Sequence, residues 1–279
     1  MGLTLTTRPA GLLRHFSWPW AVTLGYLGVM LLLPTLALIA KAGTETPADI
    51  WRIATDPVAV SAYQVTVGAS LAAALVNTPF GVLVAWVLVR YPFPGRRVVD
   101  ALVDLPFALP TSVAGLTLAT IYSDTGWLGS LLAPLGIKVS FTVYGVFVAL
   151  VFISLPFVIR TVQPVLQEMQ SEPEIEEAAR SLGANAPQTF WRVTLPPLMP
   201  AILTGFALGF SRAVGEFGSV VIIASGIPYK DLVAPVLVFQ RLEQYDYSGA
   251  TVIGVVLILI SLVVLLGINL IQVWGKRYG

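Results

Sequence analysis

The sequence predicts an all-α integral membrane protein, a bundle of six transmembrane helices. The chain of 279 residues is 56% hydrophobic, and only 11% of its residues are charged. Its mean hydropathy is +0.83. Soluble domains carry about a quarter charged residues, so much of this surface must face something other than water. Apolar stretches near the ~20 residues that cross a bilayer occupy residues 20–40, 63–89, 105–122, 141–159, 198–224 and 251–273.

The first three stretches differ in regularity. The apolar run at 20–40 is too long for the core of a typical signal peptide, so we expect it to remain as a span. The stretch at 63–89 is the longest and contains Asn77 and Pro79, which predict a kink or a tilt. Pro106 and Pro110 interrupt the start of the third stretch. Such breaks are tolerated in a membrane where neighbouring helices satisfy the freed backbone groups, which favours a packed bundle.

Basic residues predict that both chain ends lie in the cytoplasm. With that orientation the inside segments hold ten basic residues, namely Arg8, Arg14, Arg90, Arg96, Arg97, Arg160, Arg180, Arg192, Lys276 and Arg277. The outside segments hold five, namely Lys41, Arg52, Lys138, Lys230 and Arg241. Cytoplasmic loops are the ones enriched in Lys and Arg. We therefore expect a tail at 1–19, a transmembrane domain at 20–273 and a second tail at 274–279.

A polar segment at 160–197 connects the fourth and fifth stretches, and its pattern predicts two short helices. Ser171 and Glu174 have the spacing of a capping box at the first helix. Gly183 suits the position just after that helix, and Asn185 suits the cap of the second. We expect Pro196 and Pro197 to end the second helix.

The first of these helices carries a shallow apolar stripe of Ile175, Ala178, Ala179 and Leu182, spaced three to four residues apart. A face of small side chains allows another surface to approach closely. The stripe alone fits two alternatives equally well. Either the hairpin packs beneath its own bundle, or it docks on another protein.

A longer pattern in the same segment resembles a known family. Glu177-Ala-Ala179 is followed after three residues by Gly183, and after nine more by Val193-Thr-Leu-Pro196. This resembles the Glu-Ala-Ala (EAA) loop of permease subunits in binding-protein-dependent ABC importers, with Val193 in place of the family's Ile. The resemblance implies that the loop docks in a cleft of a separate ATPase, through the coupling residues Glu176, Glu177, Ala178, Ala179, Leu182 and Gly183.

Two charged residues fall within the fifth stretch. An ionised side chain at the bilayer centre costs about 2.5–3.5 kcal/mol on insertion scales, so it needs a partner or a wet cavity. Arg212 and Glu216 are four residues apart and can form a pair on one face. The pair either neutralises itself and fixes helix packing, or it lines a path in which the forked Arg212 guanidinium attracts an anion. Gly205, Gly209 and Ala213 form a small-residue stripe that predicts close helix packing on the same stretch.

The third stretch offers uncharged hydrogen-bonding groups next to its prolines. Thr111 and Ser112 follow Pro110 directly. Their hydroxyls either line a pathway or bond back to the helix at a kink. We favour the pathway.

These stretches narrow the resemblance to the oxyanion branch of the importer family. The matching segments are Asp104-Leu-Pro-Phe-Ala-Leu-Pro-Thr111 and Gly215-Glu-Phe-Gly218, the latter three residues after Arg212. The resemblance covers the chain from about residue 20 and is strongest to sulfate/thiosulfate permeases. Molybdate and tungstate permeases remain an alternative, because molybdate permeases share the Gly-Glu-Phe-Gly element. The resemblance to the importer family implies the type I (MetI-like) permease fold. It also implies that the chain is a multi-pass protein of a bacterial inner membrane.

The resemblance also implies partners. These are a homologous second permease, a cytoplasmic ABC ATPase dimer, an extracytoplasmic sulfate/thiosulfate-binding protein and membrane lipid. The chain has no Gly-x4-Gly-Lys-[Ser/Thr] phosphate-binding loop. We therefore expect ATP and magnesium to be bound by the ATPase partner, with no cofactor in this chain. The outer loop at 225–249 is expected either to contact the binding protein or to form a helix on the membrane surface.

Composition argues against other functional classes. The chain contains no cysteine and one histidine, His15, so the usual constellations of a membrane hydrolase or a metal site are missing. A net charge of +1 gives no bulk field that would favour a nucleic-acid partner. An ion-coupled secondary carrier remains the alternative from a different class. Such a carrier usually shows unpaired membrane carboxylates and would leave the EAA loop unexplained.

Overall fold

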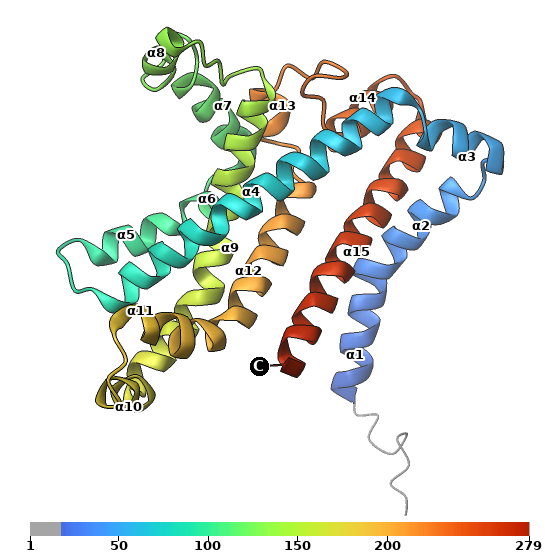
Figure 1. Ribbon diagram of the computed structural model, residues 1–279. Coiled ribbons are helices and arrows are strands. Elements are labelled where there is room, and N and C mark those ends of the chain that lie inside the picture. The colour runs from blue at the N-terminus through green and yellow to red at the C-terminus, as the bar shows by residue number, and fades with distance from the viewer. Residues whose placement is uncertain (1–17, 279) are drawn as a thin grey trace, which may run out of the picture.

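The computed structural model describes residues 18–278, and side chains as far as Leu270. Within this range the chain is helical and contains no strand, and its long helices run between two ends of an elongated bundle (Figure 1). Most of the predicted N-terminal tail, residues 1–17, and residue 279 of the predicted C-terminal tail lie outside the described residues.

Five helical stretches of the described residues are long and apolar enough to cross a membrane. They are Trp18–Ala42, Pro57–Arg90, Val143–Ser171, Ala186–Val214 and Tyr247–Leu270. The first comprises α1 (Trp18–Leu27), a π turn (Gly28–Leu32) and α2 (Leu33–Ala42). The second is α4 (Pro57–Arg90) and the third is α9 (Val143–Ser171). The fourth ends in α12 (Leu195–Val214), and the fifth belongs to α15 (Tyr247–Tyr278).

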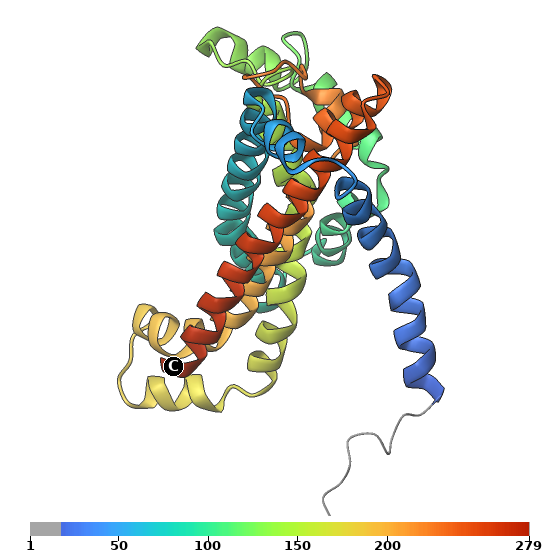
Figure 2. The same ribbon diagram turned by 90° about the vertical axis from the view of Figure 1, so that its right-hand side faces the viewer.

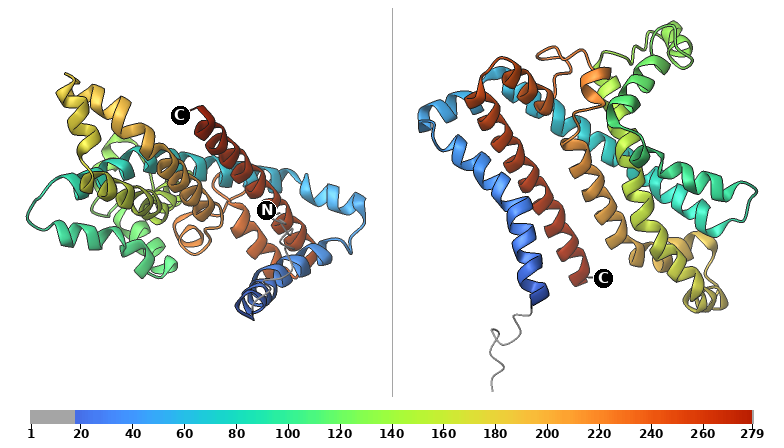
Figure 3. Two further views of the ribbon diagram at one scale, coloured as in Figure 1. Left: turned by 90° about the horizontal axis from the view of Figure 1, so that it is seen from below. Right: turned by 180° about the vertical axis from the view of Figure 1, so that it is seen from behind.

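Helices α4, α9 and α12 form the centre of the bundle (Figure 3). Val158 of α9 is fully buried between two glycines. A Cβ atom on Gly81 of α4 would lie 2.7 Å from the Val158 Cβ, and one on Gly205 of α12 would lie 2.8 Å from the Val158 Cα. Glycine at these two positions therefore permits the close approach. The predicted small-residue stripe is confirmed, because Gly205, Gly209 and Ala213 are all buried.

One buried amide joins α4 to α9. Asn77 is 1% exposed, and its Nδ2 atom donates to Ser154 Oγ at 2.8 Å and to the Val151 carbonyl at 2.9 Å. An unpaired polar group in hydrocarbon is costly, so this pairing fixes the register of the two helices. Helix α4 continues through Pro79 to Arg90 without interruption.

The predicted third span is broken rather than continuous. Residues 105–122 form α6 (Leu105–Ala108) and α7 (Thr111–Ile121), separated at Leu109 and Pro110. Proline lacks an N–H, and it disfavours helical backbone in the residue before it. Helix α7 has 11 residues, or about 16 Å at 1.5 Å per residue, and is too short to cross a bilayer alone. Helix α5 (Arg96–Val103) precedes α6 beside α9.

The predicted fifth span also ends early. Helix α12 stops at Val214, and Gly215 to Ser219 form an irregular segment before the short α13 (Val220–Ile223). Glu216 therefore lies beyond the helix and not in its middle. Arg212 occupies the last turn, where the negative end of the helix dipole favours a cation.

The remaining helices cover the two ends of the bundle. At one end are α3 (Pro47–Ala54), α8 (Gly129–Leu132) with a 3₁₀ turn (Ala133–Leu135), and α14 (Ala234–Glu243). Helix α14 lies within the loop for which two alternatives were left open, and it packs against α4 and α15 with Ala234, Val236 and Leu237 buried. Helix α10 (Glu174–Ser181) and α11 (Ala186–Thr189) lie at the opposite end.

The polar segment at 160–197 differs from the prediction at both borders. Helix α9 continues to Ser171, whose hydroxyl donates to the Gln167 carbonyl, so the predicted Ser171 cap was wrong and Pro173 precedes α10 instead. The second helix does not end at Pro196. A π turn at Phe190–Thr194, closed by the Leu195 N–H on the Phe190 carbonyl, leads directly into α12. The prolines then occupy the first turn of α12, next to the π turn. Proline lacks an N–H, so it cannot continue the hydrogen bonds of the preceding turn.

Candidate functional site

The charged pair predicted in the fifth stretch forms across the end of α12. Arg212 Nη1 lies 2.7 Å from Glu216 Oε2. The Glu216 side chain is 2% exposed, whereas the Arg212 side chain is 33% exposed. A buried carboxylate must be paired or hydrogen-bonded. The guanidinium supplies the paired charge and keeps part of its surface open.

The second oxygen of Glu216 is also bound. Oε1 accepts hydrogen bonds from the Ser219 backbone N–H and from the Ser219 hydroxyl, each at 2.9 Å. One carboxylate oxygen thus binds Ser219 and the other binds Arg212. The bonds to Ser219 close a turn in the irregular segment. Because Glu216 is fixed by three contacts, it holds the Arg212 guanidinium in a defined position.

The other two predicted pathway residues lie beside this segment. A Cβ atom added to Gly218 would lie 2.1 Å from the Thr111 hydroxyl and 3.4 Å from the Ser112 nitrogen. A Cβ atom added to Gly115 would lie 2.5 Å from the Ser219 carbonyl. The structure therefore brings the start of α7 and the Gly215–Ser219 segment together, and two glycines permit the contact.

The start of α7 offers donor groups of the kind that bind anions. Helix α7 begins at Thr111, and its first-turn amides have no partner within the helix. Such amides and the positive end of the helix dipole favour negative charge. Ser112 is exposed and Thr111 is partly buried. Hydroxyl and amide donors at the start of α7 thus lie beside the Gly215–Ser219 segment, and Glu216 of that segment binds Arg212.

The predicted coupling residues are gathered on α10, and most of them face outward. Leu182 is 90% exposed and Ile175 is 72% exposed, and Glu177, Ala178 and Gly183 are exposed as well. Ala179 is half-buried. A hairpin packed beneath its own bundle would bury this stripe, so the structure favours the docking alternative.

Gly183 closes α10 in the predicted way. Its φ is +90°, a backbone conformation that favours glycine. The Gly183 N–H donates to the Arg180 carbonyl at 2.9 Å, and the Ala184 N–H donates to the Ala179 carbonyl at 3.0 Å. This is a Schellman motif. Asn185 forms the predicted cap of α11 with Gln188.

Glu176 differs from the other predicted coupling residues because it faces inward. Its side chain is 9% exposed and pairs with Arg90 at the end of α4. Thr194 also donates to Glu176 Oε1 at 3.2 Å. Glu176 therefore does not lie on the exposed face of α10 with the other predicted coupling residues. Glu174, Glu176 and Glu177 all occur in the first turn of α10, and sequence alone does not show which one faces the bundle.

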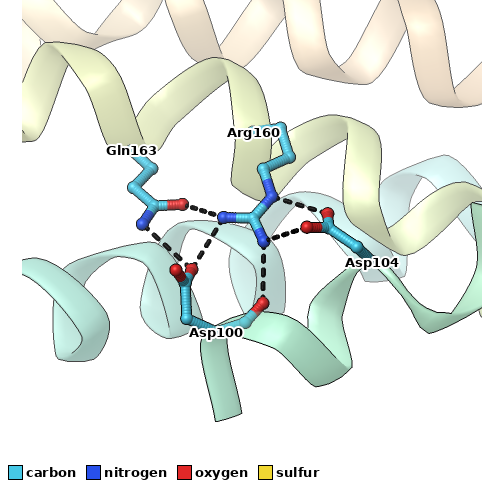
Figure 4. A network of polar contacts seen from close by, with 4 residues as sticks. All are labelled: Asp100, Asp104, Arg160 and Gln163. Atoms are coloured by element: carbon cyan, nitrogen blue, oxygen red, sulfur yellow. Dashed lines mark hydrogen bonds and ion pairs between the residues drawn. The ribbon is translucent and has the colours of Figure 1, made fainter. Parts of the chain in front are cut away.

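A network of ion pairs and hydrogen bonds around Arg160 was not predicted from the sequence. Arg160 of α9 donates through Nε and Nη2 to Asp104 at 2.8 and 2.7 Å, and through Nη1 to Asp100 at 2.7 Å (Figure 4). Gln163 donates to the same Asp100 carboxylate at 3.2 Å. The signal available was the four-residue spacing of two aspartates, which places them on one helix face.

The Arg160 network fixes α5 and α6 against α9. The Arg160 hydrogen bond holds the pKa of the Asp100 carboxyl below its usual range. Asp104 directly precedes α6, so the clamp holds the chain at the point where α6 begins. Within the described part of the chain, no three His, Cys, Asp or Glu side chains gather in a way that could hold a metal ion.

Comparison with known proteins gives consistent results. A family profile described as "Binding-protein-dependent transport system inner membrane component" matches residues 77–276. The chain is 63% identical over 265 residues to the "Sulfate transport system permease protein CysT" of Synechocystis sp., covering 95% of this chain and 92% of the relative. It is 63% identical over 262 residues to the "Probable sulfate transport system permease protein cysT" of Chlorokybus atmophyticus, covering 94% and 91%.

Solved structures share the fold. A bacterial ABC transporter involved in the import of the acidic polysaccharide alginate matches with a TM-score of 0.72 at 19% identity, covering 91% of this chain and 94% of that chain. The MetNI methionine ABC transporter in an inward-facing conformation matches with a TM-score of 0.54 at 19% identity, covering 84% and 97%. At these identities the likeness concerns the fold alone.

Proposed function

This chain belongs to the inner membrane components of binding-protein-dependent transport systems, and we propose that it is the permease subunit of an ATP-driven sulfate importer. The evidence for sulfate as the substrate is the 63% identity to a sulfate permease over nearly the whole chain. The chain is a transport component and not a catalytic one. It is a multi-pass membrane protein of the MetI-like importer permease fold.

The substrate is sulfate or thiosulfate, moved from the extracytoplasmic side to the cytoplasm. Arg212 attracts the anion through the open part of its guanidinium, and the hydroxyls of Thr111 and Ser112 offer uncharged contacts. The Glu216 carboxylate competes for Arg212 at 2.7 Å. It therefore weakens the hold on the anion, because tight binding would delay release.

ATP and magnesium are bound by a partner ATPase dimer, which docks on the exposed face of α10. A second homologous permease completes the pathway, and a soluble binding protein delivers the anion outside. Closure of the ATPase moves α10 and switches the side on which the spans are open. In this arrangement α10, the start of α1 and the end of α15, which share one end of the bundle (Figures 1 and 2), face the cytoplasm of a bacterial cell.

Uptake of radiolabelled sulfate in cells that lack this chain tests the proposal. We expect the wild type to restore uptake, and Arg212→Ala to restore less than a tenth of it at equal membrane levels. Excess thiosulfate should compete. Failure of the wild type to restore sulfate uptake, or competition by molybdate alone, would overturn the assignment.

The docking face is tested separately with Ala178→Asp. Ala178 is exposed, so the substitution places a charge on the docking face without disturbing the core. We expect the ATPase to co-purify poorly with this variant, and uptake to fall with it. Normal co-purification and normal uptake would remove α10 from the docking surface.

A further inference from the structure

The only inward-facing charge on α10 is tied to the end of a different membrane helix. Arg90, the last residue of α4, donates through Nη1 to Glu176 Oε2 at 3.1 Å and through Nη2 to Glu176 Oε1. Both oxygens of the carboxylate and both terminal nitrogens of the guanidinium are therefore engaged. Such bidentate pairs fix orientation as well as distance.

The pair is shielded from water, unlike an ordinary surface ion pair. The side chain of Arg90 is 18% exposed and that of Glu176 is 9% exposed. The Arg90 guanidinium carbon also lies 5.0 Å from the centre of the Trp86 ring, one turn earlier on α4. Arg90 Nε is buried without a hydrogen-bond partner among the described residues. Glu176 and the Trp86 ring are thus the compensation for burying this cation.

The rest of α10 gives few other points of attachment to the membrane helices. Its backbone neighbours are α11 and the π turn at 190–194, which follow it directly in the chain. Its apolar stripe is exposed, with Ile175 at 72% and Leu182 at 90%. The link to α4 is made by side chains that are 86 residues apart in the sequence.

Helix α4 is well suited to carry a displacement away from this link. It is an unbroken helix of 34 residues, about 51 Å long at 1.5 Å per residue. It packs against α9 and α12 in the centre of the bundle and against α14 at the opposite end. A displacement of Arg90 therefore reaches the outer end through one rigid element.

We propose that Arg90 is a positioning residue for transport, whose ion pair with Glu176 makes α10 and α4 move as one unit. Without the pair, α10 follows the ATPase while its movement reaches α12 through the flanking loops and the π turn at 190–194, and α4 no longer moves with it. This inference rests on the proposed function for its uptake measurement, but its distance measurement does not depend on the substrate.

The structure supplies a matched control on the same carboxylate. Arg180 Nη2 lies 3.4 Å from Glu176 Oε2, but Arg180 belongs to α10 itself and its side chain is 63% exposed. Arg180→Ala removes a cation from Glu176 without cutting a link between helices. Arg90→Ala removes the cation that joins α10 to α4.

The first experiment measures sulfate transported per ATP hydrolysed, in proteoliposomes that hold the complete importer. We expect Arg90→Ala to reduce this ratio at least tenfold while the ATPase subunits remain bound and active. Arg180→Ala should stay within twofold of the wild type. Arg90→Lys, which keeps the charge but not the fork, should recover part of the loss. The charge exchange Arg90→Glu with Glu176→Arg should recover more than Arg90→Glu alone.

The second experiment measures the distance between spin labels on α4 and α10. The chain has no cysteine, so cysteines at the exposed positions Leu83 and Ser181 take labels without background. We expect the distance to be the same with and without trapped nucleotide in the wild type, and to shift or broaden by several ångströms in Arg90→Ala.

Three results would overturn the proposal. They are an unchanged transport ratio in Arg90→Ala, an equal loss in Arg180→Ala, and an interlabel distance that changes with nucleotide in the wild type. Dissociation of the ATPase from Arg90→Ala would also contradict it, because Arg90 would then support docking rather than transmission. If the wild-type importer moves no sulfate, the proposed function fails, and the label distances still decide whether the two helices move together.

Discussion

At the scale of single residues, three sets of ion pairs tie helix ends and neighbouring helices together. Arg212 and Glu216 bridge the end of α12, Arg90 and Glu176 join α4 to α10, and Arg160 clamps α5 and α6 to α9. Glu176 and Glu216 are almost fully buried, and a lone buried charge is costly, so each needs its arginine. Asp100 and Asp104 are 42% and 51% exposed, so burial does not require their pairing with Arg160. The arginines differ in exposure: the Arg212 side chain is 33% exposed and that of Arg90 is 18% exposed. A more exposed guanidinium has more surface open to a ligand.

The two interpretations of Arg212 are separated by removing both charges at once. We expect Arg212→Met combined with Glu216→Gln to insert and fold like the wild type, because no unpaired charge is left buried. We also expect it to lose at least nine-tenths of sulfate uptake, because the donor for the anion is gone.

The measurement is labelled sulfate uptake at matched membrane levels, with Glu216→Gln alone as the control. The single change leaves Arg212 without its carboxylate but keeps the cation. Near-normal uptake by the double variant would show that the pair serves packing only.

The pH response of the Arg160 clamp follows from the lowered pKa of Asp100. A carboxyl whose folded pKa lies below its unfolded value of about 3.9 adds stability above that pH, and the contribution disappears as pH falls through the folded pKa. Because the Asp100 side chain is 42% exposed, solvent screening keeps the contribution small, at most about 1 kcal/mol.

We therefore expect Asp100→Asn to lower the thermal midpoint of the purified protein at pH 7 by no more than about 2–4 °C. The difference should be constant from pH 8 to pH 5 and should shrink as the pH falls below the unfolded pKa of about 3.9 and through the lower folded pKa. Tryptophan fluorescence during heating measures it, with the exposed Asp124→Asn as the control. A difference that grows as the pH falls would contradict the assignment.

At the scale of elements, the breaks are more informative than the spans. Helix α6 ends before Pro110 and α12 ends before Gly215, and the two breaks meet where α7 contacts the Gly215–Ser219 segment. In a continuous helix at either place, the backbone N–H and C=O groups would all be used by hydrogen bonds within the helix. The breaks leave such groups for contacts with a ligand or a neighbouring segment.

The contact between the breaks depends on Gly115. A Cβ atom there would lie 2.5 Å from the Ser219 carbonyl and 2.7 Å from the Ser219 Cα, both backbone atoms that cannot turn away. We expect Gly115→Ala to displace α7 and to reduce uptake at least fivefold. Overpacking of this kind typically costs about 1–3 kcal/mol, which the bundle tolerates.

A matched glycine on α4 serves as the control for this change. Gly68 has nothing within 4 Å of an added Cβ atom, so Gly68→Ala should leave uptake unchanged. Both variants are compared by uptake and by membrane level. Equal uptake in the two variants would show that the close approach at Gly115 is not required.

At the scale of the whole molecule, the bundle is asymmetric. Helices α4, α9 and α12 bury one another, whereas α1 diverges from the bundle (Figure 2) and has no buried residue. Its leucine, valine and tryptophan side chains are exposed in the isolated chain. In a bilayer such a helix is covered by lipid or by another subunit. We do not expect α1 to be stable when its apolar side chains are exposed to water.

Labelling with a membrane-impermeant maleimide tests the orientation of the whole molecule. Ser181 lies on α10, and Ser130 lies on α8 at the opposite end of the bundle. We expect a cysteine at position 130 to react in spheroplasts, and one at position 181 to react only after the membrane is permeabilised. The reverse pattern would place α10 outside and would remove the ATPase docking proposal.

Much of the fold was readable from the sequence, because membrane insertion depends on local properties. Apolar length located five of the six predicted spans, and the small residues at 205, 209 and 213 located a packed face. The pattern from Glu177 to Pro196 located the segment of α10 and α11 at one end of the bundle. Each signal is contained within a few turns of one helix. The positions of Gly183 and Asn185 were also predictable, since caps depend on the backbone next to them.

The tertiary structure alone decided what depends on distant neighbours. It decided that α12 ends between Arg212 and Glu216, that Glu176 faces Arg90, and that Arg160 binds Asp100 and Asp104. These partners lie 86 and about 60 residues apart in sequence, and local periodicity carries no information about such pairs. Proline marks where a helix is weakened, but the packing of neighbouring helices determines whether it breaks, as at Pro110, or continues, as at Pro79.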